Sequence, residues 1–203
     1  MPTTDIVGLA GVALGIAALG MALGRLTGLG RVWLVVLGTV CTALSLIPIA
    51  KLPLAASLRG VTGDLSVTTL LLLGRFVLRP VLDWEPLEAR AGRALRLTMT
   101  AGGILLYPLA LGLGLWDPYT LGYGKPWFLG GLAILAAAWL FLDFPQLAGG
   151  LALGVLAWGL GLLESRNLWD YLLDPFVFAW GFWALLIWSG KALGFKNRAG
   201  SSS

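Results

Sequence analysis

Six stretches of the chain contain almost no charged residue: 6–24, 32–50, 97–116, 127–142, 147–163 and 175–190. A helix needs roughly 20 apolar residues to cross the ~30 Å hydrocarbon core of a bilayer, and most of these stretches reach or approach that length. Polar positions do not alternate with apolar ones as they do in strands, and backbone groups in lipid must be hydrogen-bonded within their own segment. The pattern therefore predicts an all-α fold, a polytopic transmembrane helical bundle.

A further stretch, 65–82, begins apolar but contains Arg75, Arg79 and Pro80 in its second half. If it spans, the bundle has seven helices; if it lies at the interface or re-enters, the bundle has six. Arg75 precedes Leu82 by about 10 Å of helix, so its guanidinium can extend to the headgroups. We therefore expect seven helices in a single transmembrane domain, 1–198, and interpret 199–203 as a flexible tail or a cloning remnant.

Lys and Arg are retained on the cytoplasmic side of a membrane. With seven helices and an outer N-terminus, nine basic residues lie inside and four outside; with six helices and an inner N-terminus, the numbers are ten and four. The basic residues nearest the first helix, Arg25 and Arg31, follow it and favour the outer N-terminus. Both arrangements place the C-terminus and 84–96 in the cytoplasm, and the loops 117–126 and 164–174 outside. No basic residue precedes the first apolar stretch, so we expect no cleavable signal peptide.

Composition supports the membrane prediction. Hydrophobic residues make up 58% of the 203 positions and charged residues 12%, against about 25% charged in a soluble domain. The net charge of +4 is explained by retention of basic residues inside, so no nucleic-acid partner is expected. The absence of histidine excludes histidine-ligated haem, the usual zinc sites and a histidine base, and we expect no metal or cofactor. Richness in Ala, Leu, Gly and Arg is typical of a bacterial cytoplasmic (inner) membrane protein.

The two outer loops hold most of the candidate chemistry. Their carboxylates are candidates for acid/base work, since a carboxyl near apolar surface can have a raised pKa: Asp117, Glu164, Asp170 and Asp174. The other candidates would contact a lipid headgroup or a partner: Lys125, Arg166, Tyr119, Tyr123 and Trp169. The structural alternative is that Asp174-Pro175 starts a helix and that the aromatic residues form an interfacial belt.

On the cytoplasmic side, Arg75, Arg79 and Asp83 follow one another at intervals of four residues and share a helical face. They predict either a site for an anionic headgroup or phosphate, or a set of interfacial anchors, with Asp83, Glu85 or Asp143 as ion-pair partners. Residues 85–96 predict either a solvated run of charges that sets the topology or a short interfacial helix that meets anionic lipid. Glycines four residues apart predict close helix packing: Gly11 with Gly15, Gly20 with Gly24, and Gly150 with Gly154.

These features lead to two functional hypotheses. The first is a non-catalytic accessory or structural subunit that docks a membrane or outer-face protein, or a second copy, through its helices and outer loops. The alternative is an enzyme or binding protein for a lipid-linked or phospholipid substrate at the outer face. A transporter is less expected, because the helix centres carry almost none of the ionisable groups that transport pathways use.

Overall fold

The computed structural model describes residues 3–49, 52–83 and 87–200, with only the backbone given for 49 and 190–200. Helices make up most of the described chain: α1 (Thr3–Leu26), α2 (Arg31–Leu46), α3 (Leu54–Thr62), α4 (Val67–Leu82), α5 (Ala89–Ala110), the 3₁₀ helix η1 (Pro118–Gly122), α6 (Pro126–Phe141), α7 (Pro145–Gly159), α8 (Leu168–Leu172) and α9 (Pro175–Gly200). A two-residue hairpin, β1 (Pro48–Ile49) with β2 (Leu52–Pro53), precedes α3. The predicted all-α fold is confirmed.

The glycine pairs mark the places where helices meet. A Cβ added at Gly24 of α1 would lie 2.9 Å from Leu37 of α2, and one added at Gly11 would lie 2.9 Å from Leu70 of α4. A Cβ at Gly154 of α7 would lie 2.6 Å from Leu172 of α8. A side chain at these positions would displace its neighbours, so close packing is confirmed at Gly11, Gly24 and Gly154. A Cβ at Gly15 or Gly150 would instead make ordinary van der Waals contacts, at 3.9 and 3.5 Å.

The segment 65–82, which the sequence left between two interpretations, contains helix α4. Ser66 caps it by accepting a hydrogen bond from the Thr69 backbone N–H at 3.2 Å. Pro80 lies in its last turn, and Asp83 follows in the left-handed conformation with φ 47°. The helix packs against α1, α2 and α7, so it is an integral part of the bundle.

Helix α5 differs in extent from the expected span 97–116. It begins at Ala89, so most of the predicted interfacial helix 85–96 is its first part, and it ends at Ala110. Gly112 has a φ of 85°, a left-handed conformation that ends a helix readily, and residues 111–117 form a loop. Glu85 and Lys51 lie outside the described residues, as does most of the expected tail 199–203, of which 199–200 belong to α9.

Contacts at the helix termini define two ends of the molecule. Arg31 at the start of α2 pairs with Asp83 after α4, with 2.8 Å between Nη1 and Oδ1, and Arg90 of α5 lies 5.6 Å from the ring centroid of Phe144, just before α7. We call this the basic end. The opposite end, the acidic end, holds the start of α1, the end of α3 and the segments around η1 and α8. The described chain contains seven helices of 15 or more residues: α1, α2, α4, α5, α6, α7 and α9.

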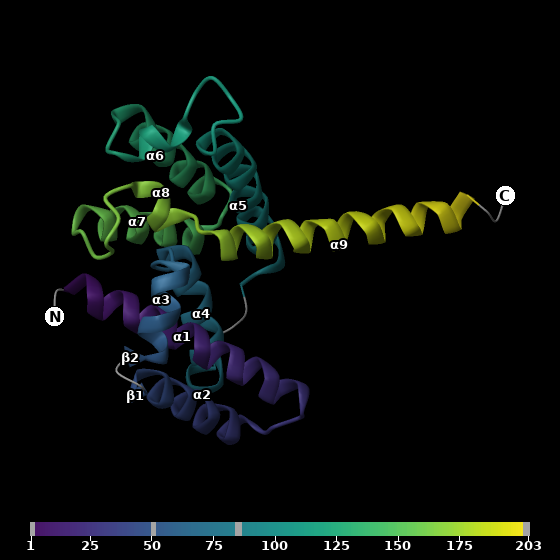
Figure 1. Ribbon diagram of the computed structural model, residues 1–203. Coiled ribbons are helices and arrows are strands. Elements are labelled where there is room, and N and C mark those ends of the chain that lie inside the picture. The colour runs from purple at the N-terminus through teal and green to yellow at the C-terminus, as the bar shows by residue number, and fades with distance from the viewer. Residues whose placement is uncertain (1–2, 50–51, 84–86, 201–203) are drawn as a thin grey trace.

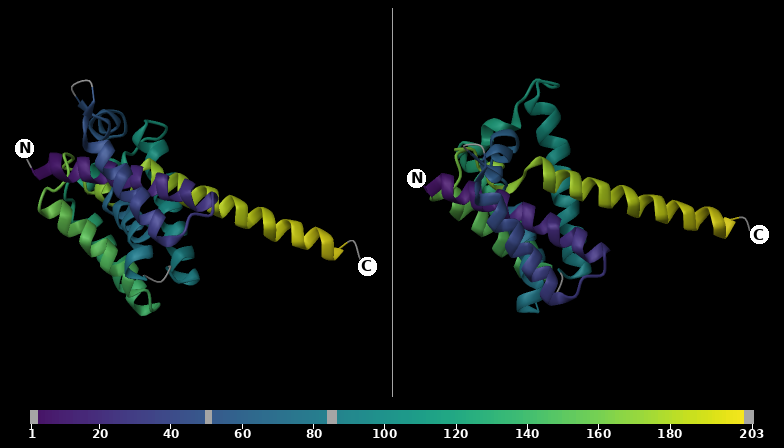
Figure 2. Two further views of the ribbon diagram at one scale, coloured as in Figure 1. Left: turned by 90° about the horizontal axis from the view of Figure 1, so that it is seen from below. Right: turned by 60° about the horizontal axis from the view of Figure 1, so that its bottom comes forward.

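The long helices are not all parallel. In Figure 1, α1 and α9 run across the view, whereas α5 stands steeply to them. The core lies where α5, α6, α7 and the start of α9 meet, around Leu95, Trp139 and Leu147. Helix α9 packs on α5 at its N-terminal part and then extends away from the body, with no neighbouring helix along its C-terminal part in any view (Figures 1 and 2).

Candidate functional site

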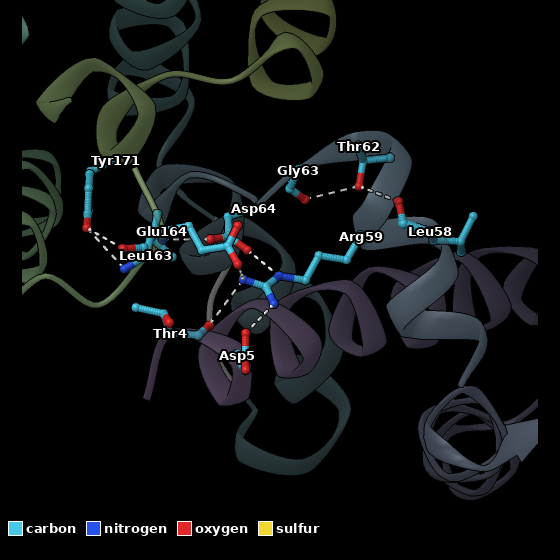
Figure 3. A network of polar contacts seen from close by, with 10 residues as sticks. All are labelled: Thr4, Asp5, Leu58, Arg59, Thr62, Gly63, Asp64, Leu163, Glu164 and Tyr171. Atoms are coloured by element: carbon cyan, nitrogen blue, oxygen red, sulfur yellow. Dashed lines mark hydrogen bonds and ion pairs between the residues drawn. The ribbon is translucent and has the colours of Figure 1, made fainter. Parts of the chain in front are cut away.

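An arginine bound by three carboxylates lies at the centre of the acidic end. Arg59, in the last turn of α3, places Nε 2.6 Å from Oδ1 of Asp64 and Nη1 3.1 Å from Oδ1 of Asp5 (Figure 3). Its Nη2 lies 3.0 Å from Oε1 of Glu164. Gly63, with φ 71°, turns the chain after α3 so that Asp64 returns to face the guanidinium. The three carboxylates come from α1, the α3–α4 turn and the segment before α8.

The Arg59 cluster (Asp5, Arg59, Asp64, Glu164) is partly shielded from solvent. The Arg59 side chain is 13% exposed and that of Asp64 9%, whereas that of Glu164 is 66% exposed. The hydrogen bond to Asp64 raises the pKa of Arg59 above its usual range, more than burial lowers it. Asp64 also accepts the Glu164 backbone N–H through Oδ2 at 3.0 Å. The cluster therefore holds α1, α3 and the segment after α7 together.

Asp170 of α8 is the acceptor at the centre of a second polar group. Its Oδ2 accepts hydrogen bonds from the Tyr119 hydroxyl at 2.8 Å and from the Ser165 hydroxyl at 2.5 Å. Burial, followed by the hydrogen bond to Asp170, raises the pKa of Tyr119 above its usual range. Asn167 caps α8 through the Trp169 backbone N–H at 3.0 Å and donates its Nδ2 to the Tyr119 carbonyl at 2.8 Å. These bonds fix η1 against α8.

Asp174 joins the starts of two helices. Its Oδ1 accepts the Val177 backbone N–H at 2.8 Å, which caps α9, and its Oδ2 accepts the Ser66 backbone N–H at 2.8 Å, just before α4. The residue is 6% exposed. The helix start predicted from Asp174-Pro175 is confirmed. Asp174 therefore caps α9 and binds the segment before α4. It also lines the cavity described below.

The buried side chain of Tyr171 stabilises the segment 163–165. Tyr171 is fully buried, and its hydroxyl lies 3.0 Å from the Leu163 backbone N–H and 3.1 Å from the Ser165 carbonyl. Burial raises its pKa. The hydroxyl fixes the segment that carries Glu164 and Ser165.

Several of these groups line a cavity of about 450 Å³, which we call the polar cavity. Its polar lining includes Asp64, Tyr107, Tyr119, Glu164, Ser165, Asp170 and Asp174, and its apolar lining includes Leu106, Ala110, Leu163, Leu173 and Pro175. The Tyr107 hydroxyl oxygen is buried and has no hydrogen-bond partner among the described residues. The cavity therefore offers carboxylate and hydroxyl groups to a small ligand.

A larger cavity, of about 730 Å³, lies between α4, α5, α6 and α7, and we call it the apolar cavity. Most of its lining is aliphatic or aromatic, with Leu72, Met99, Leu135, Trp139 and Leu151 among the apolar residues. Arg75 is the one charged residue among the described residues that line it. Three lining leucines are 41–49% exposed, so the cavity opens at the surface: Leu71, Leu105 and Leu153.

The structure brings only part of the predicted outer set to the polar cavity. Glu164, Asp170, Asp174 and Tyr119 line it. Asp117 instead caps η1, with Oδ1 2.9 Å from the Tyr119 backbone N–H. Among the other predicted contact residues, Trp169 lines the apolar cavity and donates its indole N–H to the Pro118 carbonyl. Tyr123 packs edge-on against Tyr119. Lys125 and Arg166 are exposed.

The predicted basic set near the other end is also divided. Arg75 lines the apolar cavity, whereas Arg79 is exposed. Asp83 was one of three carboxylates expected to pair with these arginines, but it pairs with Arg31. Asp83 follows the last residue of α4 in the left-handed conformation, so it does not continue the helical face that carries Arg75 and Arg79.

Sequence reasoning missed the residues at the centre of the acidic end. Asp5, Arg59 and Asp64 were not candidates, because all three lie outside the loops 117–126 and 164–174 and Asp5 is far from the other two in sequence. One signal was available: the seven-helix arrangement places all three on the same side as the loops 117–126 and 164–174. No family model, no curated protein and no solved structure matches the chain, so the function is argued from this geometry.

Proposed function

We propose that this chain is a multi-pass protein of the bacterial cytoplasmic membrane that holds a lipid in the apolar cavity. Among the described residues, α1 is the one helix that is both long and apolar enough to cross a bilayer, with a mean hydropathy of 2.3. Buried core helices of soluble proteins and signal sequences have the same properties. The support for several spans therefore comes from the surfaces of the other helices.

Helix α6 carries a long apolar stripe on its outside. Trp127, Ile134 and Phe141, each seven residues from the next, are 86%, 73% and 94% exposed. The stripe is about 21 Å long, and soluble monomers rarely expose apolar patches of this extent. Contact with lipid chains would remove this apolar surface from water, which is favourable.

The lengths of the helices limit how they can span. Helices of 15 or 16 residues, such as α2, α4, α6 and α7, are about 24 Å long, shorter than the ~30 Å core. They span with the help of apolar residues in the adjoining loops or by local thinning of the bilayer. Helix α5 stands steeply to α1 (Figure 1), so it would be strongly tilted in a bilayer that contains α1 upright.

Thiol labelling tests this arrangement. Cys41 is replaced by Ser, and single cysteines are placed at Asp117, near the acidic end, and at Asp143, near the basic end. In intact spheroplasts, a membrane-impermeant maleimide is expected to label position 117 and to label position 143 only after lysis. Labelling of both positions in intact cells, or recovery of the chain in the soluble fraction, would refute the proposed spans.

The apolar cavity carries the functional part of the proposal. Its volume of about 730 Å³ lies within the range of known ligand sites, its mouth is formed by exposed leucines, and Arg75 supplies one positive charge. A cavity that opens toward acyl chains is filled by them, because water would leave its apolar walls unfavourably hydrated. An anionic lipid would place its acyl chains on the apolar walls and its negative charge on the side of the cavity that Arg75 lines.

Native mass spectrometry of the gently extracted protein tests lipid binding. Gly149 lines the cavity, and a Cβ there would meet nothing within 4 Å. Gly149→Leu is therefore expected to leave the fold intact and to reduce the co-purifying lipid. Gly130→Leu is the matched control, because Gly130 is equally open but lies outside the lining of the cavity. Equal lipid retention in both variants, or no bound lipid in the parent protein, would refute the proposal.

Helix α9 favours a second function, that of an accessory subunit. Its exposed residues Trp183, Leu186, Ile187 and Trp188 are 47–66% exposed, and the helix leaves the body of the molecule (Figure 1). A photo-crosslinking residue at Trp183 is expected to capture a discrete protein or a second copy in native membranes. The same residue at Ile134 of α6 is the control. Capture of lipid alone at both positions would reject the subunit.

A further inference from the structure

We propose that the polar cavity binds an organic ammonium group, either as the headgroup of a lipid or as a free amine. This inference uses the proposed membrane location but not the lipid in the apolar cavity. The two cavities are neighbours, and Leu173 is the one described residue that lines both. The argument rests on the charge, the chemistry and the size of the polar cavity.

The charge of the lining is negative. Asp64 and Glu164 share Arg59 as their cation. Asp170 and Asp174 also line the cavity, and within the described chain their hydrogen-bond donors are all neutral: two hydroxyls for Asp170 and two backbone N–H groups for Asp174. Two carboxylates without a cationic partner beside one cavity attract a positively charged ligand.

The arrangement favours an organic cation over a metal ion. Nowhere in the described chain do three carboxylates come close enough together to hold a metal. The lining instead combines carboxylates and tyrosines with Leu106, Ala110, Leu163 and Pro175. An ammonium group on a short carbon chain can donate to the carboxylates, lie against tyrosine rings and place its carbons on the apolar lining.

Tyr107 supplies the observation that is independent of the carboxylates. Its ring packs edge-on against Phe178 at 5.3 Å between centroids, which fixes its direction. Tyr107 is half-buried and lines the cavity, and its hydroxyl oxygen is buried and makes no hydrogen bond within the described chain. A buried polar group without a partner is unfavourable, and a ligand in the cavity would provide one.

Calorimetric titration of the purified full chain in detergent tests the inference. The probes are ethanolamine, dihexanoyl-phosphatidylethanolamine and dihexanoyl-phosphatidylglycerol, of which the last two share the phosphate and the chains. We expect the ethanolamine lipid to bind at least about tenfold more tightly than the glycerol lipid. Binding of ethanolamine as tight as that of its lipid identifies a free amine as the ligand, and tighter binding of the lipid identifies a headgroup. Equal affinity for the two lipids, or no binding of either amine, overturns the inference.

Three variants separate a binding role from a structural one. Asp170→Asn keeps an acceptor for Tyr119 and Ser165 but removes the charge, so the affinity for the amine should fall about tenfold or more with the fold intact. Tyr107→Phe removes a hydroxyl that no described residue uses, so amine binding should weaken while thermal stability is unchanged or higher. Asp117→Asn is the matched control, an exposed carboxylate at the same end, and should bind as the parent does. Unchanged affinity in both cavity variants would overturn the inference, whatever the thiol labelling or the lipid analysis shows.

Discussion

Replacement of Arg59 by Gln tests whether the Arg59 cluster holds the acidic end together. The change removes the positive charge and leaves three carboxylates facing one another. Asp64 is the important partner, since its side chain is 9% exposed and that of Arg59 13%. Removing one member of a buried ion pair typically destabilises a protein by about 3–5 kcal/mol, because the other charge is left without compensation.

The other two partners add less. Glu164 is 66% exposed and Asp5 30%, and ion pairs at exposed positions contribute about 0–1 kcal/mol. Because Arg59 retains some access to water, we expect a loss near the lower limit for a buried pair, about 3 kcal/mol. Glu164→Gln should lower the free energy of unfolding by no more than about 1 kcal/mol and is the control.

Equilibrium unfolding in mixed micelles with increasing dodecyl sulfate measures both variants. The chain has 10 tryptophans, so their fluorescence reports the transition. Alkaline pH is no substitute for the mutation, since the hydrogen bond to Asp64 raises the pKa of Arg59 and keeps it charged throughout the accessible range. A loss below about 1 kcal/mol for Arg59→Gln would equal that of an exposed pair and would refute a clamping role for the cluster.

Three further changes follow from the structure. Tyr119 has a raised pKa in the folded chain. Above about pH 10 the unfolded chain therefore releases a proton that the folded chain retains, and the free energy of unfolding should fall as pH rises. Tyr119→Phe should reduce that fall in alkaline unfolding curves. Gly103→Val places a side chain against the ring of Phe178 and should destabilise by about 1–3 kcal/mol, whereas Gly130→Val, in open space, should cost less than about 1 kcal/mol in the same micellar titration. Asp143 has a φ of 60°, so Asp143→Gly should raise the free energy of unfolding by up to about 1 kcal/mol, and a decrease would contradict the backbone argument.

The sequence predicted those parts of the fold that depend on local pattern. The apolar stretches became the long helices, the glycine pairs of α1 and α7 became contact points, and the Asp174-Pro175 pair became a capped helix start. Each of these follows from residues within one or two helical turns. Turn geometry was less accessible: the end of α5 at Ala110 depends on the left-handed Gly112, and nothing in the apolar pattern distinguishes 97–110 from 111–116.

The candidate site was predictable only in part, because its centre depends on long-range contacts. Arg59 and its partner Asp5 are 54 residues apart in sequence, and the short helix α3 that carries Arg59 was not predicted. The chain must turn at Gly63 before Asp64 reaches the guanidinium, and α1 must pack beside α3 before Asp5 does. The predicted outer N-terminus is the one feature of the sequence that places Asp5, Arg59 and Asp64 on the side of the predicted loops.

The distribution of cations at the acidic end changes the chemistry that this end can support. The cations predicted to contact a lipid headgroup or a partner, Lys125 and Arg166, are exposed and do not line the polar cavity. The one arginine beside the cavity, Arg59, has its Nε and both terminal nitrogens engaged by carboxylates. An anion entering the cavity would therefore meet Asp170 and Asp174 without a free cation among the described residues that line it, and like charges in a shielded site repel strongly. The lining of the polar cavity therefore favours an amine over an anionic group, and the comparison of ethanolamine and glycerol headgroups measures that preference.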